Sequence, residues 1–98
     1  MNVYRFIFKA YPTENHPELH PWQRATLVLF VGNSESHMAE EEAFKELNRR
    51  YWVPESFEHK DILIRDAVRK EGGKVWNAYI QAEQGEIFWL EELDSLPL

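Results

Sequence analysis

The sequence predicts a single α+β domain over residues 1–98, in which a four-stranded, mainly antiparallel sheet carries two helices on one face. Three observations predict this class. Four segments either alternate apolar and polar residues or are apolar on both sides, as strands do. Two segments carry apolar residues at spacings of three and four, as amphipathic helices do. The segments follow one another in the order ββααββ, so two hairpins flank a helical pair.

The first strand is expected at residues 3–11, where apolar Phe6 and Phe8 alternate with charged positions such as Arg5. Pro12 ends it. The second strand is expected at residues 23–31. Its run from Ala25 to Val31 is apolar on both sides and is interrupted only by Thr26. We therefore expect it to lie centrally, with both faces covered.

The helices are expected at residues 36–51 and 56–71, where apolar residues recur at spacings of three and four. In the first helix these residues are Ala39, Ala43, Phe44, Leu47 and Tyr51, and in the second they include Phe57, Ile64, Ala67 and Val68. Pro54 separates the two patterns. Gly72 and Gly73 supply the left-handed backbone that commonly ends a helix.

The last two strands are expected at residues 74–83 and 86–91, joined by a short turn at Gln84 and Gly85. In the first of them, one side carries Trp76, Ala78, Ile80 and Ala82, and the other carries Val75, Asn77, Tyr79 and Gln81. An alternative topology is the ferredoxin-like fold, whose order is βαββαβ. It requires a short extra strand near Trp52, between the two helices.

The chain is acidic, with 17 Asp and Glu against 11 Lys and Arg and a formal net charge of −6. This balance argues against nucleic acid as a partner, because phosphates are bound by clustered cations. The chain has no Cys, so disulfides, thiolate nucleophiles and Cys-based metal centres are excluded. The longest apolar run is far shorter than the ~20 residues that span a bilayer, and no signal-peptide pattern is visible. We expect no membrane partner and a cytoplasmic location.

The C-terminal stretch from Glu83 carries five acidic residues and no basic one, with aromatic residues between them. Aromatic side chains are good anchors at protein interfaces. We therefore expect a basic protein partner to bind here, through Glu86, Trp89, Glu91 and Glu92. The alternative is that the acidic side chains protect an edge strand against stray pairing.

A second set of candidate residues would bind a small ligand: His16, His20, Arg49, Arg50 and Trp52. The histidines lie in the polar loop of residues 12–22, and loops of this length are often functional. The arginines offer bidentate donors for a carboxylate or another anion, with an aromatic wall beside them. The alternatives are a proline-stiffened hairpin loop and a helix C-terminus that favours cations.

No Ser-His-Asp order, metal motif or cofactor loop is present, so we assign no catalytic residue, metal ligand or cofactor. We expect a small acidic interaction module that regulates or neutralises a basic partner. Four Trp residues exceed what one small core needs, so both sheet faces should be used and the chain should form a homo-oligomer. The alternatives are a dimeric ligand-binding or sensor domain, and a small enzyme that uses His20 with Glu18.

Overall fold

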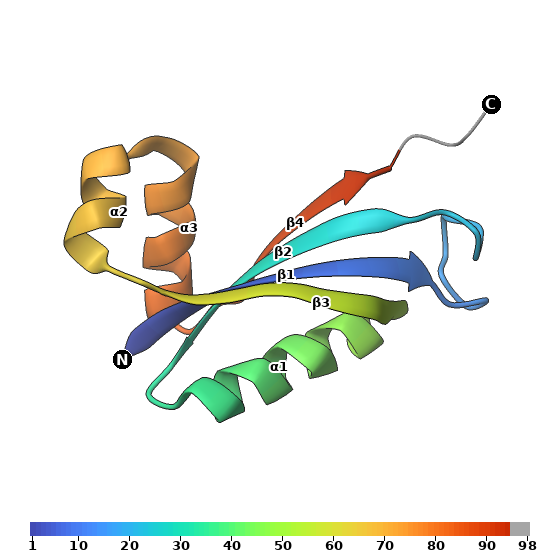
Figure 1. The fold of residues 1–98 in the computed structure, drawn as a ribbon, viewed down its shortest axis with the longest axis horizontal. Helices are drawn as coiled ribbons and strands as arrows, with labels where there is room; N and C mark the ends of the chain where they lie inside the picture. The colour runs from blue at the N-terminus through green and yellow to red at the C-terminus, as the bar shows by residue number, and fades with distance from the viewer. Residues whose placement is uncertain (95–98) are drawn as a thin grey trace.

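The computed structural model describes residues 1–94, and its four strands lie in the order β3-β1-β2-β4, with every neighbouring pair antiparallel. The strands are β1 (Asn2–Pro12), β2 (Ala25–Asn33), β3 (Trp52–Leu63) and β4 (Phe88–Leu93). The helices are α1 (Ser36–Arg49), α2 (Arg65–Glu71) and α3 (Gly73–Glu83) (Figure 1). The predicted class is confirmed: the fold is α+β, with a four-stranded antiparallel sheet on which the helices pack.

The first half of the chain folds as predicted. β1 and β2 form a hairpin in which Phe6 lies opposite Leu29 and Phe8 opposite Leu27. All four side chains are fully buried against α1. The strand and helix ranges agree with the predicted ones to within two residues at each end, because period-two and helical patterns are unambiguous there.

The predicted helix at residues 56–71 is wrong over most of its length. Residues 52–63 form β3, which pairs with β1 from Trp52 opposite Pro12 to Leu63 opposite Val3. Apolar residues at helical spacing are too sparse here to bury a helix, whereas the free side of β1 offers a full row of backbone partners. Only the last seven residues of the predicted helix, α2, are helical. Gly72 ends α2 with a φ of 67°, as predicted.

The predicted strand at residues 74–83 is also wrong, because this segment is helix α3. Apolar residues alternate in this segment as in a strand, but some of them also lie on one face of a helix. Ala78, Tyr79 and Ala82 are spaced by one and three residues, and all three are buried against the sheet. β4 therefore pairs with β2 rather than with residues 74–83, and it lies two residues later than predicted.

The helices lie on opposite faces of the sheet, which corrects the prediction that both cover one face. α1 packs on the helix-covered face, formed by Tyr4, Phe6 and Phe8 of β1 and their neighbours. α2 and α3 pack on the other face, over Val3 and Phe30 at one end (Figure 1). We call this second face the open face, because the helices cover only that end of it.

The ferredoxin-like alternative is excluded, since β1 and β2 follow each other without a helix between them. A strand does begin at Trp52, as that alternative required, but it runs for 12 residues rather than a few. Among residues 1–94, no helix is long and apolar enough to cross a membrane.

Candidate functional site

The end of α1 meets β4 in a cluster of charged and aromatic side chains on the helix-covered side. Glu46 is buried on α1 and accepts hydrogen bonds from the guanidinium groups of Arg49 and Arg50. Arg50 in turn lies over the ring of Trp89, 4.5 Å from its centre. The Trp89 indole Nε1 donates to a Glu91 carboxylate oxygen at 3.1 Å. We call these five residues the Trp89 junction.

The charge state of Glu46 follows from these contacts. Burial by itself raises the pKa of its carboxyl, but the hydrogen bonds and charges of Arg49 and Arg50 outweigh burial and lower the pKa below its usual 4.5. The hydrogen bond from Glu46 correspondingly raises the pKa of Arg49. The Glu46 carboxylate is therefore ionised at neutral pH. The guanidinium groups of Arg49 and Arg50 are hydrogen-bonded to Glu46. A hollow of about 280 Å³ on the Arg49 side is lined by Glu42, Lys45, Glu46, Arg49 and Ile87.

The junction brings together residues that the sequence analysis had placed in two different sites. Arg49 and Arg50 were expected to bind a ligand, whereas Trp89 and Glu91 were expected to bind a partner. Their proximity follows from the pairing of β4 with β2, which sets Trp89 opposite Leu29 on the helix-covered face. Glu92 lies opposite Thr26 on the open face and is exposed. Glu86 is exposed in the turn before β4.

β4 is one edge of the sheet, and its pairing leaves a regular row of backbone groups on the outer side. The amide of Asp94, just past the strand, donates to the carbonyl of Arg24 at 2.9 Å. Backbone direction alternates along a strand. The N–H and C=O groups of Glu92 therefore point towards β2, and those of Trp89, Glu91 and Leu93 point outwards. No register shift interrupts the pairing of β4 with β2.

β3, the opposite edge, is built differently. It contains Pro54, which has no N–H to offer, and its pairing with β1 shifts register twice. Prolines, charged residues and bulges are the usual protection of an edge strand. β4 has only Glu91 and Glu92 in that role, and its side chains Leu90 and Leu93 are about half exposed, at 50% and 49%.

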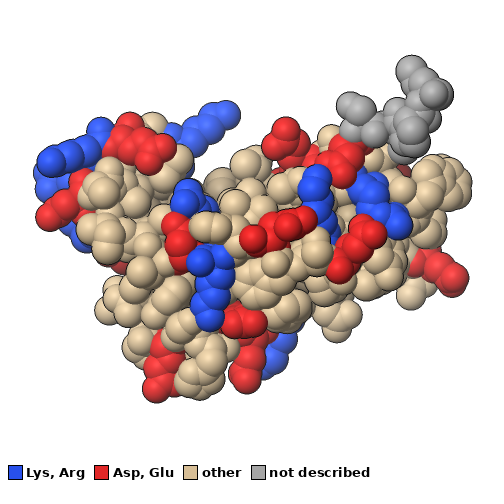
Figure 2. Space-filling view, viewed as in Figure 1, with Lys and Arg blue, Asp and Glu red and all other residues tan. Residues whose placement is uncertain are grey.

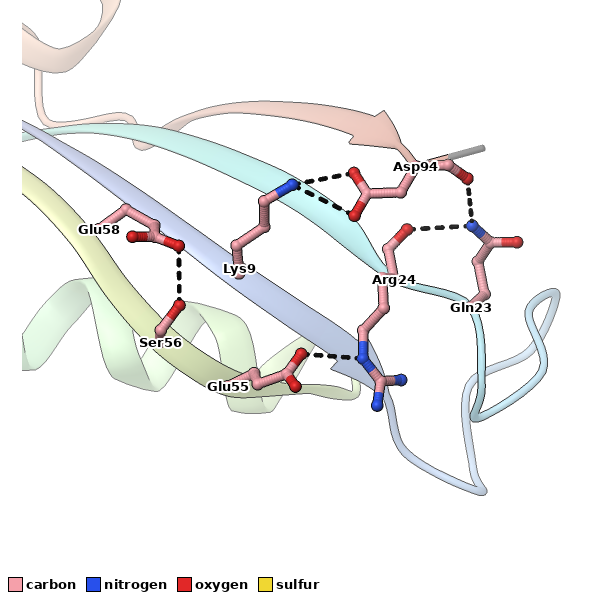
Figure 3. Close-up of polar contacts among 7 residues, drawn as sticks. All are labelled: Lys9, Gln23, Arg24, Glu55, Ser56, Glu58 and Asp94. Carbon is pink, nitrogen blue, oxygen red and sulfur yellow. Dashed lines mark hydrogen bonds and ion pairs between the residues drawn. The ribbon is translucent and has the colours of Figure 1, made fainter. Parts of the chain in front are cut away.

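Beyond the end covered by α3, the open face carries ion pairs that run across the strands. Arg5 binds Asp61 with two hydrogen bonds, of 3.0 and 2.7 Å, from β1 to β3. Lys9 binds the Asp94 carboxylate at 3.1 Å, and Arg24 pairs with Glu55 at 2.8 Å (Figure 3). Basic and acidic side chains therefore alternate over this face (Figure 2). They neutralise one another.

An apolar pocket of about 300 Å³ lies on the open face, where α3 ends its cover of the sheet. Its lining residues come from β1, β2, α3 and β4: Arg5, Ile7, Val28, Phe30, Lys74, Val75, Ala78, Phe88 and Leu90. The sequence pattern did not indicate this pocket, because Lys74 and Ala78 were predicted to lie in a strand and lie in α3 instead. The available signal was the apolar character of Ile7 and Val28 on the side of the sheet away from α1.

The two histidines of the loop at residues 13–24 contact other side chains than those of the Trp89 junction. The ring of His16 packs edge-on against Trp52, 5.3 Å between centres, and its Nδ1 accepts the amides of Glu18 and Leu19. His20 stacks on Trp22 at 4.4 Å. The contacts thus divide the five expected ligand residues into three groups: His16 with Trp52, His20 with Trp22, and Arg49 with Arg50 on Glu46.

The described part of the chain, residues 1–94, contains no group of three or more His, Asp or Glu side chains placed to hold a metal ion. No family model, curated protein or solved structure matches the chain.

Proposed function

We propose that this protein is a non-enzymatic interaction module that captures a basic protein by adding one of the partner's segments to the edge of β4. The observation that carries the proposal is the contrast between the two edges: β3 is interrupted by Pro54 and by register shifts, and β4 is regular. An extended segment that joins such an edge gains main-chain hydrogen bonds, and its alternate side chains supply specificity.

The charges at β4 favour a basic segment. Glu91 and Glu92 lie in the strand, Glu86 precedes it, and neither Glu86 nor Glu92 has a cationic partner among the described residues. Acidic side chains are visible where β4 ends (Figure 2). A cationic partner would be steered towards this edge and held in register, whereas the phosphates of nucleic acid would be repelled. The proposed setting is the cytoplasm, so the test uses a cytoplasmic extract.

The first experiment compares charge reversals of equal size. The variant Glu91→Lys/Glu92→Lys changes the edge, and Glu14→Lys/Glu41→Lys changes two exposed glutamates away from it. Each immobilised protein captures partners from the host extract, and the captured proteins are quantified. We expect a basic protein at near-stoichiometric amount with the wild type and the control, and at least ten-fold less with the edge variant. Equal capture by all three, or equal loss in both variants, would contradict the proposal.

A second pair of variants tests strand addition itself. Glu91→Pro removes an outward-pointing N–H together with the charge, and Glu91→Gln removes the charge alone. Because the Glu91 amide does not pair with β2, proline is tolerated at this edge position. We expect Glu91→Pro to lose far more capture than Glu91→Gln. Identical behaviour of the two would argue that side-chain charge, and not backbone pairing, binds the partner.

A second candidate function is self-association, and it rests on a different surface. α1 and β3 expose several large apolar side chains: Met38, Phe44, Phe57 and Ile62, with exposed fractions between 37% and 47%. Phe44 and Phe57 contact each other across the two elements, 6.0 Å between ring centres. Native mass spectrometry tests this candidate: a dimer that Met38→Glu/Ile62→Lys converts to a monomer supports it, and a wild-type monomer at tens of micromolar removes it.

A further inference from the structure

We infer that the pocket on the open face is a binding site for a small amphipathic carboxylate, whose apolar tail lies between α3 and the sheet and whose carboxylate meets Lys74. The inference is independent of capture at the β4 edge. It starts from the composition of the pocket, in which seven of the nine lining side chains are apolar and the other two, Arg5 and Lys74, are cations. Small-molecule sites commonly combine an apolar lining with a few polar groups that orient the ligand.

The two cations are not equivalent. Both guanidinium nitrogens that face Asp61 are used in its bidentate contact, so the charge of Arg5 is already compensated. Lys74 is exposed on the first turn of α3, and no ion pair of the described residues includes it. An arriving carboxylate would therefore be recognised by Lys74. Arg5 would line the pocket beside Lys74 and would stay paired with Asp61.

The apolar lining explains the tail. Ile7 and Val28 lie opposite each other in β1 and β2 and point to the open face, where α3 does not reach them fully. Leu90, opposite Val28 in β4, is half exposed. Covering these side chains with an acyl chain removes apolar surface from water, which is the main source of affinity for such a ligand. The pocket volume of about 300 Å³ is at the lower end of the usual range and favours a short chain.

The charged side chains of the pocket determine which ligand charge it accepts. The whole chain carries a net charge of −6, so its average field opposes the approach of an anion. Attraction must therefore come from a local cation. The only charged side chains in the pocket lining are the cations Arg5 and Lys74. A cationic amphiphile would meet the like charge of Lys74, since the charge of Arg5 is compensated by Asp61. The preference for a carboxylate should therefore depend on Lys74 alone.

The test uses decanoate, decanol and decylamine as probes with the full-length protein. Binding is measured by calorimetry and by amide shifts in two-dimensional NMR, below the critical micelle concentration of each probe. We expect one decanoate per chain, with shifts centred on Ile7, Val28 and Val75, and at least ten-fold weaker binding of decanol. Octanoate should bind about ten-fold more weakly than decanoate, because it buries two methylene groups fewer.

Two charge reversals serve as a matched pair. Lys74→Glu should reduce decanoate binding at least ten-fold and make decylamine the better ligand, and Lys70→Glu, on exposed α2, should leave the wild-type order intact. Thermal unfolding and circular dichroism establish that both variants fold. Three results would each overturn the inference: no saturable binding of decanoate, decanol bound as tightly as decanoate, or shifts that map to the Trp89 junction.

Discussion

The guanidinium carbon of Arg50 lies 4.5 Å from the centre of the Trp89 ring, so the residue that follows α1 is in contact with an edge strand far away in the sequence. The same guanidinium donates to Glu46 at 3.2 Å. One side chain thus couples a buried carboxylate to the strand that we propose as the partner-binding edge. Arg50 therefore adds a contact from the end of α1 to the position that β4 takes by pairing with β2.

Replacing Arg50 by alanine should destabilise the fold by about 1 kcal/mol, because both the cation–π contact and a hydrogen bond to Glu46 are lost. Arg50→Lys keeps the charge but not the planar donor group, and should fall between alanine and the wild type. Urea unfolding followed by circular dichroism measures both. Arg69→Ala, on the exposed side of α2, is the control and should change little. A value for Arg50→Ala equal to that of the control would refute the coupling.

Glu46→Gln should lower the free energy of unfolding at pH 7 by about 1–3 kcal/mol, since two charge-assisted contacts to arginine are weakened. The folded state lowers the pKa of Glu46 below 4.5, so its ionised form stabilises the fold above that pH. This contribution is lost as pH falls through the folded-state pKa.

The difference between the wild type and Glu46→Gln should therefore be largest near neutral pH and should shrink from about pH 5 downwards. Urea unfolding at a series of pH values measures it. Glu41→Gln, at an exposed position of the same helix, is the matched control. A gap between Glu46→Gln and the wild type that stays constant down to pH 3 would contradict the assigned role.

Gly32→Ala should destabilise the protein by about 1–3 kcal/mol, because a Cβ at this position would overlap the carbonyl oxygen of Ala82 on α3. The loss should appear chiefly where α3 meets β2, and near-ultraviolet circular dichroism of the Trp76 and Tyr79 stack reports on it. At Gly85 an added Cβ meets nothing within 4 Å, although φ is 92°. Gly85→Ala should therefore perturb stability through the backbone alone and leave that signal unchanged.

Tyr51 has a φ of 65°, the only positive value at a non-glycine residue among those described. It follows the end of α1, where glycine is the usual residue in this conformation. Tyr51→Gly should be more stable than Tyr51→Ala by about 1 kcal/mol, since both remove the ring and only glycine relieves the backbone. Thermal unfolding compares the two, and equal stabilities would show that the backbone relaxes on substitution.

The sequence determined the first half of the fold, and the physical reason is visible in its residues. Phe6 and Phe8 place the larger core on one side of β1, and the apolar run of β2 requires cover on both faces. Ala39, Ala43 and Leu47 then define a single stripe for α1. Each local pattern agrees with the burial that the tertiary structure provides, so propensity and packing point to the same element.

The secondary structure of residues 52–83 was decided by the tertiary structure. The segment of β3 exposes most of its side chains, so no burial pattern marks it as a strand. Its identity comes from the backbone groups of β1, which need partners on the side away from β2. In α3, Val75 and Ala78 fit either a strand or a helix. The apolar side chains Val3 and Phe30 of the sheet need cover on this face, and a helix provides it. Strand pairing and the packing of a helix on a sheet involve residues that are distant in the sequence. The pattern within a short stretch of sequence therefore does not reveal them.

The candidate sites divide in the same way. Acidic residues and aromatic anchors around Trp89 were readable from the sequence, because residue type alone suggests an interface. The contact between Arg50 and Trp89 and the regular outer edge of β4 required the strand order. So did the pocket beside Lys74, whose lining comes from four elements. The sequence by itself determined which chemical groups this protein carries and where its first three elements form, and only the packing of distant segments decided which of those groups face one another.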